Sequence, residues 1–150
     1  MSVVSQRVSK ASVTIDNILK SKIGKGLMVL VGFEESDTQA ENEWISKKIL
    51  NLRIFDDENG VMNRSIQDVD GELLIVSQFT LYAMTAKGNR PSYIKAARPE
   101  IAVPLYEDFI KTLETKCGKT IQTGTFGADM KVELINDGPV TICIDTDRKE

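Results

Sequence analysis

A buried strand followed directly by polar side chains is the first place in this sequence where chemistry is expected. Residues 73–76 form a continuous apolar run, as in a strand covered on both faces. The run leads into Ser77, Gln78, Phe79 and Thr80. Functional groups often lie where a rigid strand gives way to a loop, so these four residues are candidates for a catalytic site. The Thr80 hydroxyl is a candidate nucleophile or, alternatively, a group that only positions the substrate.

Histidine is absent from all 150 residues, and this limits the chemistry that is available. Serine or cysteine nucleophiles that rely on imidazole as a general base are excluded. Histidine-ligated metal sites are excluded too, and Cys117 and Cys143 lack the spacing of a zinc motif. We therefore expect no metal and no cofactor. An enzyme of this sequence would use hydroxyls, carboxylates, lysines, backbone amides or groups on its substrate.

A second candidate site lies near the C-terminus, where residues 136–139 read Asn-Asp-Gly-Pro. On either side, residues 131–135 and 140–144 alternate apolar and polar side chains, which is typical of half-buried strands. Asp-Gly favours a tight turn, so the sequence predicts a β-hairpin with Gly138 at its tip. Pro139 removes a hydrogen-bond donor at the point where pairing would begin. A rigid loop that directs its own carbonyls at a ligand therefore remains an alternative.

Apolar and polar residues also alternate over residues 2–16, which predicts two strands or one long bent strand. Arg7 lies within this segment. Two interpretations of its side chain remain open, because an arginine here is either solvated on the surface or bound to a backbone carbonyl or an anion.

A loop of basic residues follows Thr80 and contains no acidic residue. The whole chain has a net charge of −3, so any contact with RNA needs a local patch of positive charge. This loop is the best candidate for contacts with phosphates, and a solvated basic loop is the simpler alternative. The residues concerned, called the basic patch below, are Lys87, Arg90, Lys95 and Arg98.

Short motifs spread along nearly the whole chain carry a family resemblance when they are taken together. They are Gln6-Arg7-Val8, Ala11-Ser12-Val13, Arg53-Ile54-Phe55, Ser77-Gln78-Phe79-Thr80, Arg90-Pro91-Ser92, Thr123-Gly124, Phe126, Ala128-Asp129-Met130 and Asn136-Asp137-Gly138-Pro139-Val140-Thr141. Each motif is unspecific alone, whereas their shared order and spacing are specific. In this arrangement the sequence resembles the D-aminoacyl-tRNA deacylase family.

The resemblance implies an enzyme that hydrolyses the ester joining a D-amino acid to the 3′ end of tRNA. It also implies that glycine is accepted, because glycine lacks a chiral side chain. The implied assembly is a homodimer, in which Gly138 and Pro139, joined by a cis peptide bond, complete the partner subunit's site and reject L-aminoacyl esters. In the family, the arginine that matches Arg7 supports this loop, and the phenylalanine that matches Phe126 lies near the substrate adenosine. Met130 is expected to bind substrate as well.

Two alternatives compete with this assignment. One is a related deacylase that edits L-alanine from threonine tRNA, although the run from Gln78 to Thr80 favours the D-specific enzyme. The other is a non-catalytic RNA-binding module that uses the basic patch. Hydrolysis of D-Tyr-tRNA and L-Tyr-tRNA would separate all three.

The elements expected around these residues indicate one domain over residues 1–150. A buried strand is expected over 27–33, a helix over 39–51, and a second helix that begins at Pro99 or near Pro104. The expected fold is α/β, a β-rich single domain with a barrel-like or two-layer sheet and two main helices. No signal-peptide pattern is visible and no apolar run could span a bilayer, so a cytoplasmic protein without membrane association is expected.

Overall fold

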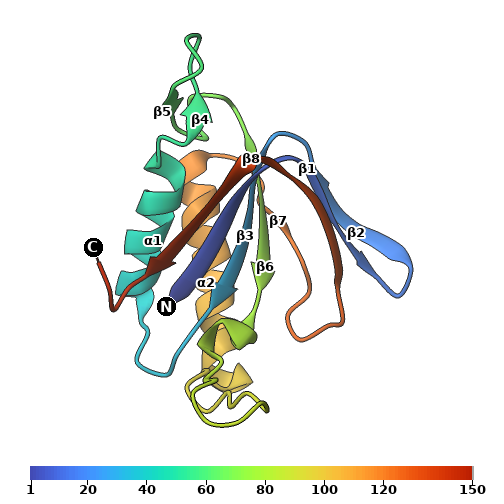
Figure 1. Ribbon diagram of the computed structural model, residues 1–150, viewed down its shortest axis with the longest axis vertical. Helices are drawn as coiled ribbons and strands as arrows, with labels where there is room; N and C mark the ends of the chain where they lie inside the picture. The colour runs from blue at the N-terminus through green and yellow to red at the C-terminus, as the bar shows by residue number, and fades with distance from the viewer. Residues whose placement is uncertain (150) are drawn as a thin grey trace.

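Two helices lie side by side against a strongly curved sheet in the computed structural model, which describes residues 1–149 (Figure 1). The strands of the sheet are β1 (Ser2–Ile15), β2 (Ile18–Ile23), β3 (Gly26–Gly32), β6 (Glu72–Ser77), β7 (Gln122–Thr123) and β8 (Lys131–Asp145). The other elements are α1 (Gln39–Asn51), α2 (Pro99–Cys117), the short 3-10 helix η1 (Phe79–Tyr82) and a small hairpin of β4 (Phe55–Asp56) and β5 (Met62–Arg64).

The long strand β1 organises the sheet because it pairs with three other strands. One edge pairs antiparallel with β8 along nearly its whole length. The other edge pairs with β3 in its first half and with β2 in its second half. Ser21 on β2 donates a hydrogen bond to the Thr123 carbonyl on β7, so the sheet curls toward a barrel. The predicted barrel-like α/β fold with two main helices is confirmed, and the N-terminal segment is one long strand.

Strands β3 and β6 run parallel at the centre of the sheet, in register from Gly26 and Glu72 to Val31 and Ser77. The apolar side chains of β6 are buried, as predicted for a strand covered on both faces. Because parallel strands end at the same edge of a sheet, the residues that follow β3 and β6 are brought together there.

Both helices begin where the sequence predicts. At the start of α1, Thr38 accepts a hydrogen bond from the amide of Ala40, while the Glu41 carboxylate accepts one from the amide of Thr38. Helix α2 begins at Pro99, the earlier of the two predicted starts. Proline is favoured there because its fixed φ suits the first helical turn, where no amide donor is needed.

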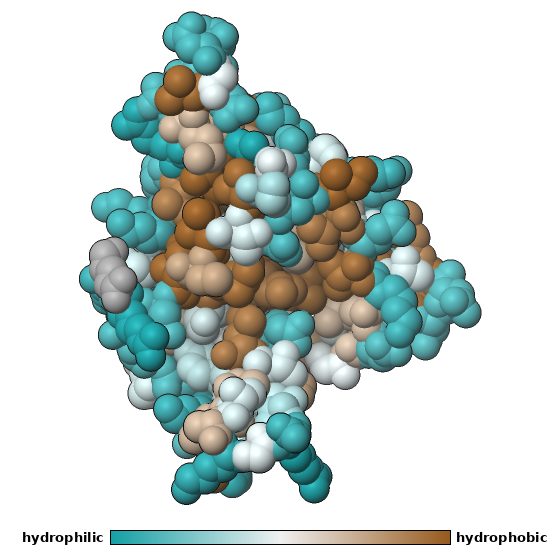
Figure 2. Space-filling model, in the orientation of Figure 1, coloured by the Kyte–Doolittle hydropathy of each residue, from teal (hydrophilic) through white to brown (hydrophobic). Residues whose placement is uncertain are grey.

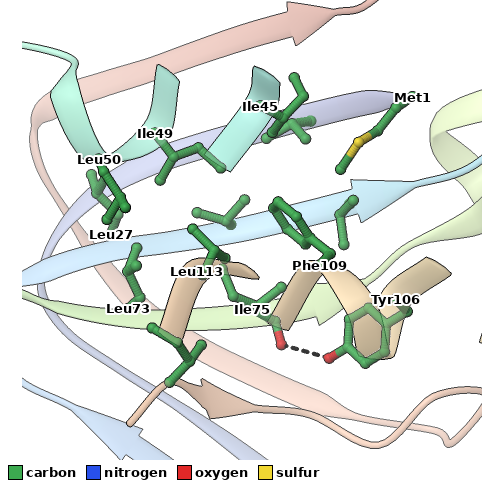
Figure 3. Packing of buried hydrophobic residues seen from close by; sticks show 14 of the residues in the cluster. Met1, Leu27, Ile45, Ile49, Leu50, Leu73, Ile75, Tyr106, Phe109 and Leu113 are labelled. Carbon is green, nitrogen blue, oxygen red and sulfur yellow. Dashed lines mark hydrogen bonds between the residues drawn. The ribbon is translucent and has the colours of Figure 1, made fainter. Parts of the chain in front are cut away.

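The main core lies between the two helices and the sheet. Figure 3 shows Ile45 and Ile49 of α1 facing Phe109 and Leu113 of α2, and all four are fully buried. Tyr106 extends from α2 and donates a hydrogen bond of 3.0 Å to the Ile75 carbonyl, and burial raises the pKa of this tyrosine to about 12. Among residues 1–149, no helix is both long and apolar enough to cross a bilayer.

The C-terminal segment is one long strand, so the predicted hairpin is wrong. Both halves of β8 pair with β1. Pairing is interrupted because Thr141 pairs with Gln6 and Asn136 pairs with Val8, which leaves Arg7 alone opposite residues 137–140. This interruption, called the 137–140 bulge below, uses Gly and Pro just as a turn would. Alternation and turn residues therefore could not distinguish a hairpin from a bulged strand.

Candidate functional site

A pocket of about 250 Å³ opens at the edge of the sheet where β3 and β6 end. One side of the pocket is formed by the last residues of these two strands. The opposite side comes from the segment between β7 and β8, and α2 with the chain before it contributes two alanines. The lining residues are Val31, Gly32, Phe33, Val76, Ser77, Gln78, Phe79, Ala97, Ala102, Phe126, Gly127, Ala128, Asp129, Met130 and Val132.

The predicted catalytic tetrapeptide lies at this pocket. Ser77, Gln78 and Phe79 line it, whereas Thr80 does not. The backbone amide of Gln78 donates a hydrogen bond of 2.7 Å to the carbonyl of Val31, and this bond joins the two strand ends. The Gln78 side chain donates to the Thr80 Oγ1 at 2.6 Å. In the described part of the chain, no carboxylate or amine forms a hydrogen bond with this hydroxyl.

Two of the predicted substrate-binding residues, Phe126 and Met130, line the same pocket. The Phe126 ring packs at a tilt against Tyr106, with 5.8 Å between the ring centroids. Because Tyr106 is anchored on α2, this contact holds Phe126 at the pocket wall. The two residues are brought together with the tetrapeptide, and their role in binding substrate stays a prediction.

Gly32, Phe33 and Asp129 also line the pocket, although the sequence does not predict them as site residues. A Cβ on Gly32 would lie 2.9 Å from the Gln78 carbonyl oxygen, so only glycine allows the two strand ends to approach this closely. The signal that could have identified Gly32 and Phe33 is the pair of buried strands, because parallel neighbours bring their C-terminal residues together. Asp129 lies within the motif Ala128-Asp129-Met130, but nothing local in the sequence distinguishes it from an acidic residue on the surface.

Arg7 is buried beside the 137–140 bulge, so the interpretation as a solvated side chain is wrong. The residue keeps only 8% of its accessible surface. Its Nε donates to the Asp137 carbonyl at 2.8 Å, and its Nη1 donates to the Ile54 carbonyl at 2.8 Å. The Asp56 carboxylate lies 3.3 Å from the same Nη1. The alternative, a donor to backbone carbonyls, is confirmed.

Asn136 and Arg7 both form hydrogen bonds that fix the 137–140 bulge. The Asn136 side chain accepts from the Val140 amide at 2.8 Å and donates to the Thr141 hydroxyl at 2.9 Å. Gly138 has a φ of 141°, and a Cβ there would lie 2.8 Å from the Val140 Cγ2. The Gly138–Pro139 peptide bond is cis. Both residues are exposed, and neither lines the pocket of its own chain.

The basic patch lies on the loop between η1 and α2, which forms the bottom of the molecule in Figure 1. Lys87, Arg90, Lys95 and Arg98 are all exposed. Among residues 1–149, none of them forms an ion pair. The loop returns to the sheet through the Ala97 amide, which donates to the Phe33 carbonyl at 2.9 Å. The four cationic side chains are therefore exposed and, within residues 1–149, not neutralised by an acidic partner, on a loop that includes the pocket residue Ala97.

Comparison with known proteins gives the family. Residues 4–145 match the family described as D-Tyr-tRNA(Tyr) deacylase. The chain belongs to this deacylase family. D-aminoacyl-tRNA deacylases of Bacteroides thetaiotaomicron and Parabacteroides distasonis are 68% and 65% identical over 150 residues, which is 100% of this chain and of each relative.

Solved structures agree with the fold. A protein titled c-Myc DNA Unwinding Element Binding Protein is 44% identical, with a TM-score of 0.92, and the match covers 97% of this chain and 99% of that one. A probable eukaryotic D-amino acid tRNA deacylase is 18% identical with a TM-score of 0.81 over 95% of this chain and 97% of that one, and supports the fold alone. Of the predicted site residues, Ser77, Gln78, Phe79, Phe126 and Met130 line the pocket, whereas Arg7, Gly138 and Pro139 lie at the 137–140 bulge.

Proposed function

We propose that this deacylase hydrolyses the ester bond of D-aminoacyl-tRNA and releases the free D-amino acid and the tRNA. The pocket at the ends of β3 and β6 would hold the terminal adenosine and the aminoacyl group. The observation that carries this proposal is the position of Ser77, Gln78 and Phe79 on the pocket wall, in a chain that matches the deacylase family over nearly its full length.

Catalysis would depend on positioning and on stabilising an oxyanion. The aminoacyl ester is already activated and the terminal ribose carries a neighbouring hydroxyl, so no protein nucleophile is required. The amides of Phe79 and Thr80 are the proposed donors, because the first amides of η1 have no acceptor within that helix. Thr80 would position the substrate, since its hydroxyl accepts a hydrogen bond from Gln78 and forms none with a carboxylate or amine among residues 1–149.

Chirality would be read by backbone atoms at Gly138 and Pro139. Their carbonyls would accept the α-ammonium group of the substrate, and an L side chain would then collide with the backbone. Support comes from the contacts that fix the bulge, because Arg7 and Asn136 hold it on both sides. Glycyl-tRNA would also be hydrolysed, since glycine has no side chain to collide. A backbone loop that is held in place moves less than side chains do, so it should exclude an L-aminoacyl ester more strictly.

The active form would be a homodimer, with Gly138 and Pro139 of each subunit completing the partner's pocket. These residues are exposed and do not line their own pocket. In the described part of the chain, β8 pairs only with β1, so its other edge is open. Figure 2 shows apolar residues gathered across the face that β8 crosses. Ile135, which belongs to β8, keeps 50% of its accessible surface. Such a surface is typical of subunit contacts.

A cytoplasmic location follows from the substrate, because tRNA is charged and used in the cytoplasm. The two free cysteines, Cys117 and Cys143, agree with a reducing compartment. The basic patch would bind phosphates near the 3′ end of the tRNA.

The test is hydrolysis of D-Tyr-tRNA, L-Tyr-tRNA and Gly-tRNA by the wild type and by Gly138→Ala. The wild type should hydrolyse the D and glycyl esters and spare the L ester. Gly138→Ala should remain folded and lose D-ester turnover, because the added Cβ strains a φ of 141° and meets Val140. Equal rates on the D and L esters would refute the assignment. Binding of tRNA without hydrolysis of any ester would indicate an RNA-binding module.

The dimer has its own test in two parts. Sedimentation at micromolar concentration should give twice the 16.7 kDa chain mass, and a monomer alone would contradict the proposal. Mixing Gly138→Ala chains with chains that lack a functional pocket should restore turnover, because one site of the mixed dimer would be intact. No recovery in a verified mixed dimer would show that each subunit uses its own residues.

A further inference from the structure

Phe79 and Tyr93 form an exposed aromatic pair at the mouth of the pocket. Their ring centroids lie 5.1 Å apart and the ring planes meet at 76°, which is an edge-to-face contact. Phe79 keeps 55% and Tyr93 keeps 39% of its accessible surface, so neither ring belongs to the core. Aromatic rings that are fixed in place and left in water are typical of a surface that receives a flat apolar group.

The backbone around Tyr93 is fixed although it lies on a long loop. Ser92 and Met84 exchange two hydrogen bonds, of 2.8 and 3.0 Å. The Tyr93 carbonyl accepts a hydrogen bond from the Ala96 amide at 3.0 Å, and Ala97 ties the next residues to the end of β3. The ring is therefore held before any ligand arrives, which reduces the entropy lost on binding.

The charges around this aromatic pair indicate the chemistry of its ligand. The basic patch flanks Tyr93 in sequence, with Arg90 before it and Lys95 after it, and both are exposed. No acidic residue occurs between residues 80 and 99. Aromatic rings combined with free cations are the two features that bind single-stranded nucleic acid, because rings stack on bases and cations contact phosphates.

We propose that Tyr93, supported by the edge of Phe79, stacks on the base of the nucleotide that precedes the terminal adenosine of the tRNA. The inference rests on the proposed function, which puts that adenosine in the pocket lined by Phe79. Because Tyr93 contacts Phe79, the nucleotide next to the pocket's occupant lies within its reach. Tyr93 is thus a positioning residue that aligns the single-stranded 3′ end. It takes no part in the chemical step.

The experiment compares a substrate that carries the preceding nucleotide, within the whole tRNA, with one that ends at the terminal adenosine. One is D-Tyr-tRNA, and the other is the 3′-D-tyrosyl ester of adenosine, which lacks the preceding base. Tyr93→Ala should lower kcat/KM on the tRNA by between about 5-fold and 150-fold, mainly through KM, because this is the usual effect of losing one stacked base. It should leave the adenosine ester unaffected. Tyr93→Phe should restore the tRNA activity, since the ring is kept.

Ile94→Ala is the matched control, because Ile94 is the neighbouring residue and is 84% exposed but not aromatic. It should behave like the wild type on both substrates. An equal loss on both substrates for Tyr93→Ala, or no loss on either, would overturn the stacking proposal. So would a loss of the same size for Ile94→Ala, since apolar contact rather than stacking would then explain the effect.

Failure of the proposed function would be visible separately, because the wild type would then hydrolyse neither D-ester. Stacking would in that case be measured with a short RNA ending in the tRNA 3′ sequence, with 2-aminopurine as the base before the terminal adenosine. Wild-type protein should quench its fluorescence and Tyr93→Ala should not. Equal quenching by both proteins would overturn the inference.

Discussion

Replacement of Arg7 by methionine should separate the support of the 137–140 bulge from the folding of the rest of the sheet. Methionine keeps the length and apolar stem of the arginine, but it donates no hydrogen bonds. The carbonyls of Asp137 and Ile54 would each lose a donor at 2.8 Å. The Ile54 residue is buried, so its carbonyl would be left without a partner, whereas Asp137 is exposed and can accept water instead.

The expected destabilisation follows from these three contacts. An orphaned buried carbonyl costs about 1–3 kcal/mol, and a hydrogen bond from a charged donor that water replaces costs about 1 kcal/mol. The ion pair with Asp56 adds about 0–1 kcal/mol, because that carboxylate is half exposed and screened by solvent. The free energy of unfolding should therefore fall by about 2–5 kcal/mol, and Tm by roughly 4–20 °C for a chain of this length.

The assays are urea unfolding and single-turnover hydrolysis of D-Tyr-tRNA and L-Tyr-tRNA. Arg53→Met is the matched control, because Arg53 also donates to a backbone carbonyl, that of Asn63, but on the exposed surface. Arg7→Met should lower kcat/KM on the D ester by roughly 10- to 100-fold, the equivalent of one charged hydrogen bond. Lost stability with unchanged D-ester turnover would refute the idea that Arg7 positions the bulge. An unchanged free energy of unfolding in Arg7→Met would refute the predicted destabilisation.

Three further predictions address the hydroxyl, the charges and a helix cap. Thr80→Ala should keep measurable single-turnover activity, and complete loss together with a trapped acyl-enzyme in the wild type would identify Thr80 as a nucleophile. Changing all four basic-patch residues to serine should weaken tRNA binding and reduce its salt slope by about 0.7–0.9 per lost phosphate contact. Unchanged affinity and slope would make the patch ordinary surface. The hydrogen bond from Thr38 lowers the pKa of Glu41 below its ordinary value of 4.5. The ionised Glu41 therefore stabilises the folded state above pH 4.5. This stabilisation is lost as the pH falls through the lowered pKa. Glu41→Gln should therefore reduce urea stability at neutral pH but not in acid, and equal losses at both would contradict this.

Local signals were sufficient where a short stretch determines its own structure. The capping box at Thr38 and the proline at Pro99 mark the helix starts because each satisfies or removes amide donors of the first turn. The apolar run of β6 identified a buried central strand, and with it the tetrapeptide at the pocket. These features depend on neighbours in sequence, so a single chain reveals them without an alignment.

Contacts between residues far apart in the sequence were harder to predict from local patterns. The two arms of β8 look like a hairpin, because nothing local shows that both pair with β1. The partners of Arg7 lie 47 and 130 residues away, so its burial could only be offered as an alternative. The parts of the pocket contributed by Gly32 and Phe33 depend on the parallel pairing of β3 and β6, a property of the folded sheet.

The interruption of β8 has a consequence for how specificity can change. Residues 137–140 stand outside the β1–β8 ladder, while pairing with β1 continues on both sides of them, with a further register shift between Val8 and Lys10. Substitutions within this short segment alter few of the hydrogen bonds that hold the sheet together. A library randomised at these positions on an unchanged scaffold should consequently yield many folded variants with different substrate preferences. If the proposed function holds, stereochemical preference should then be changeable without loss of the fold.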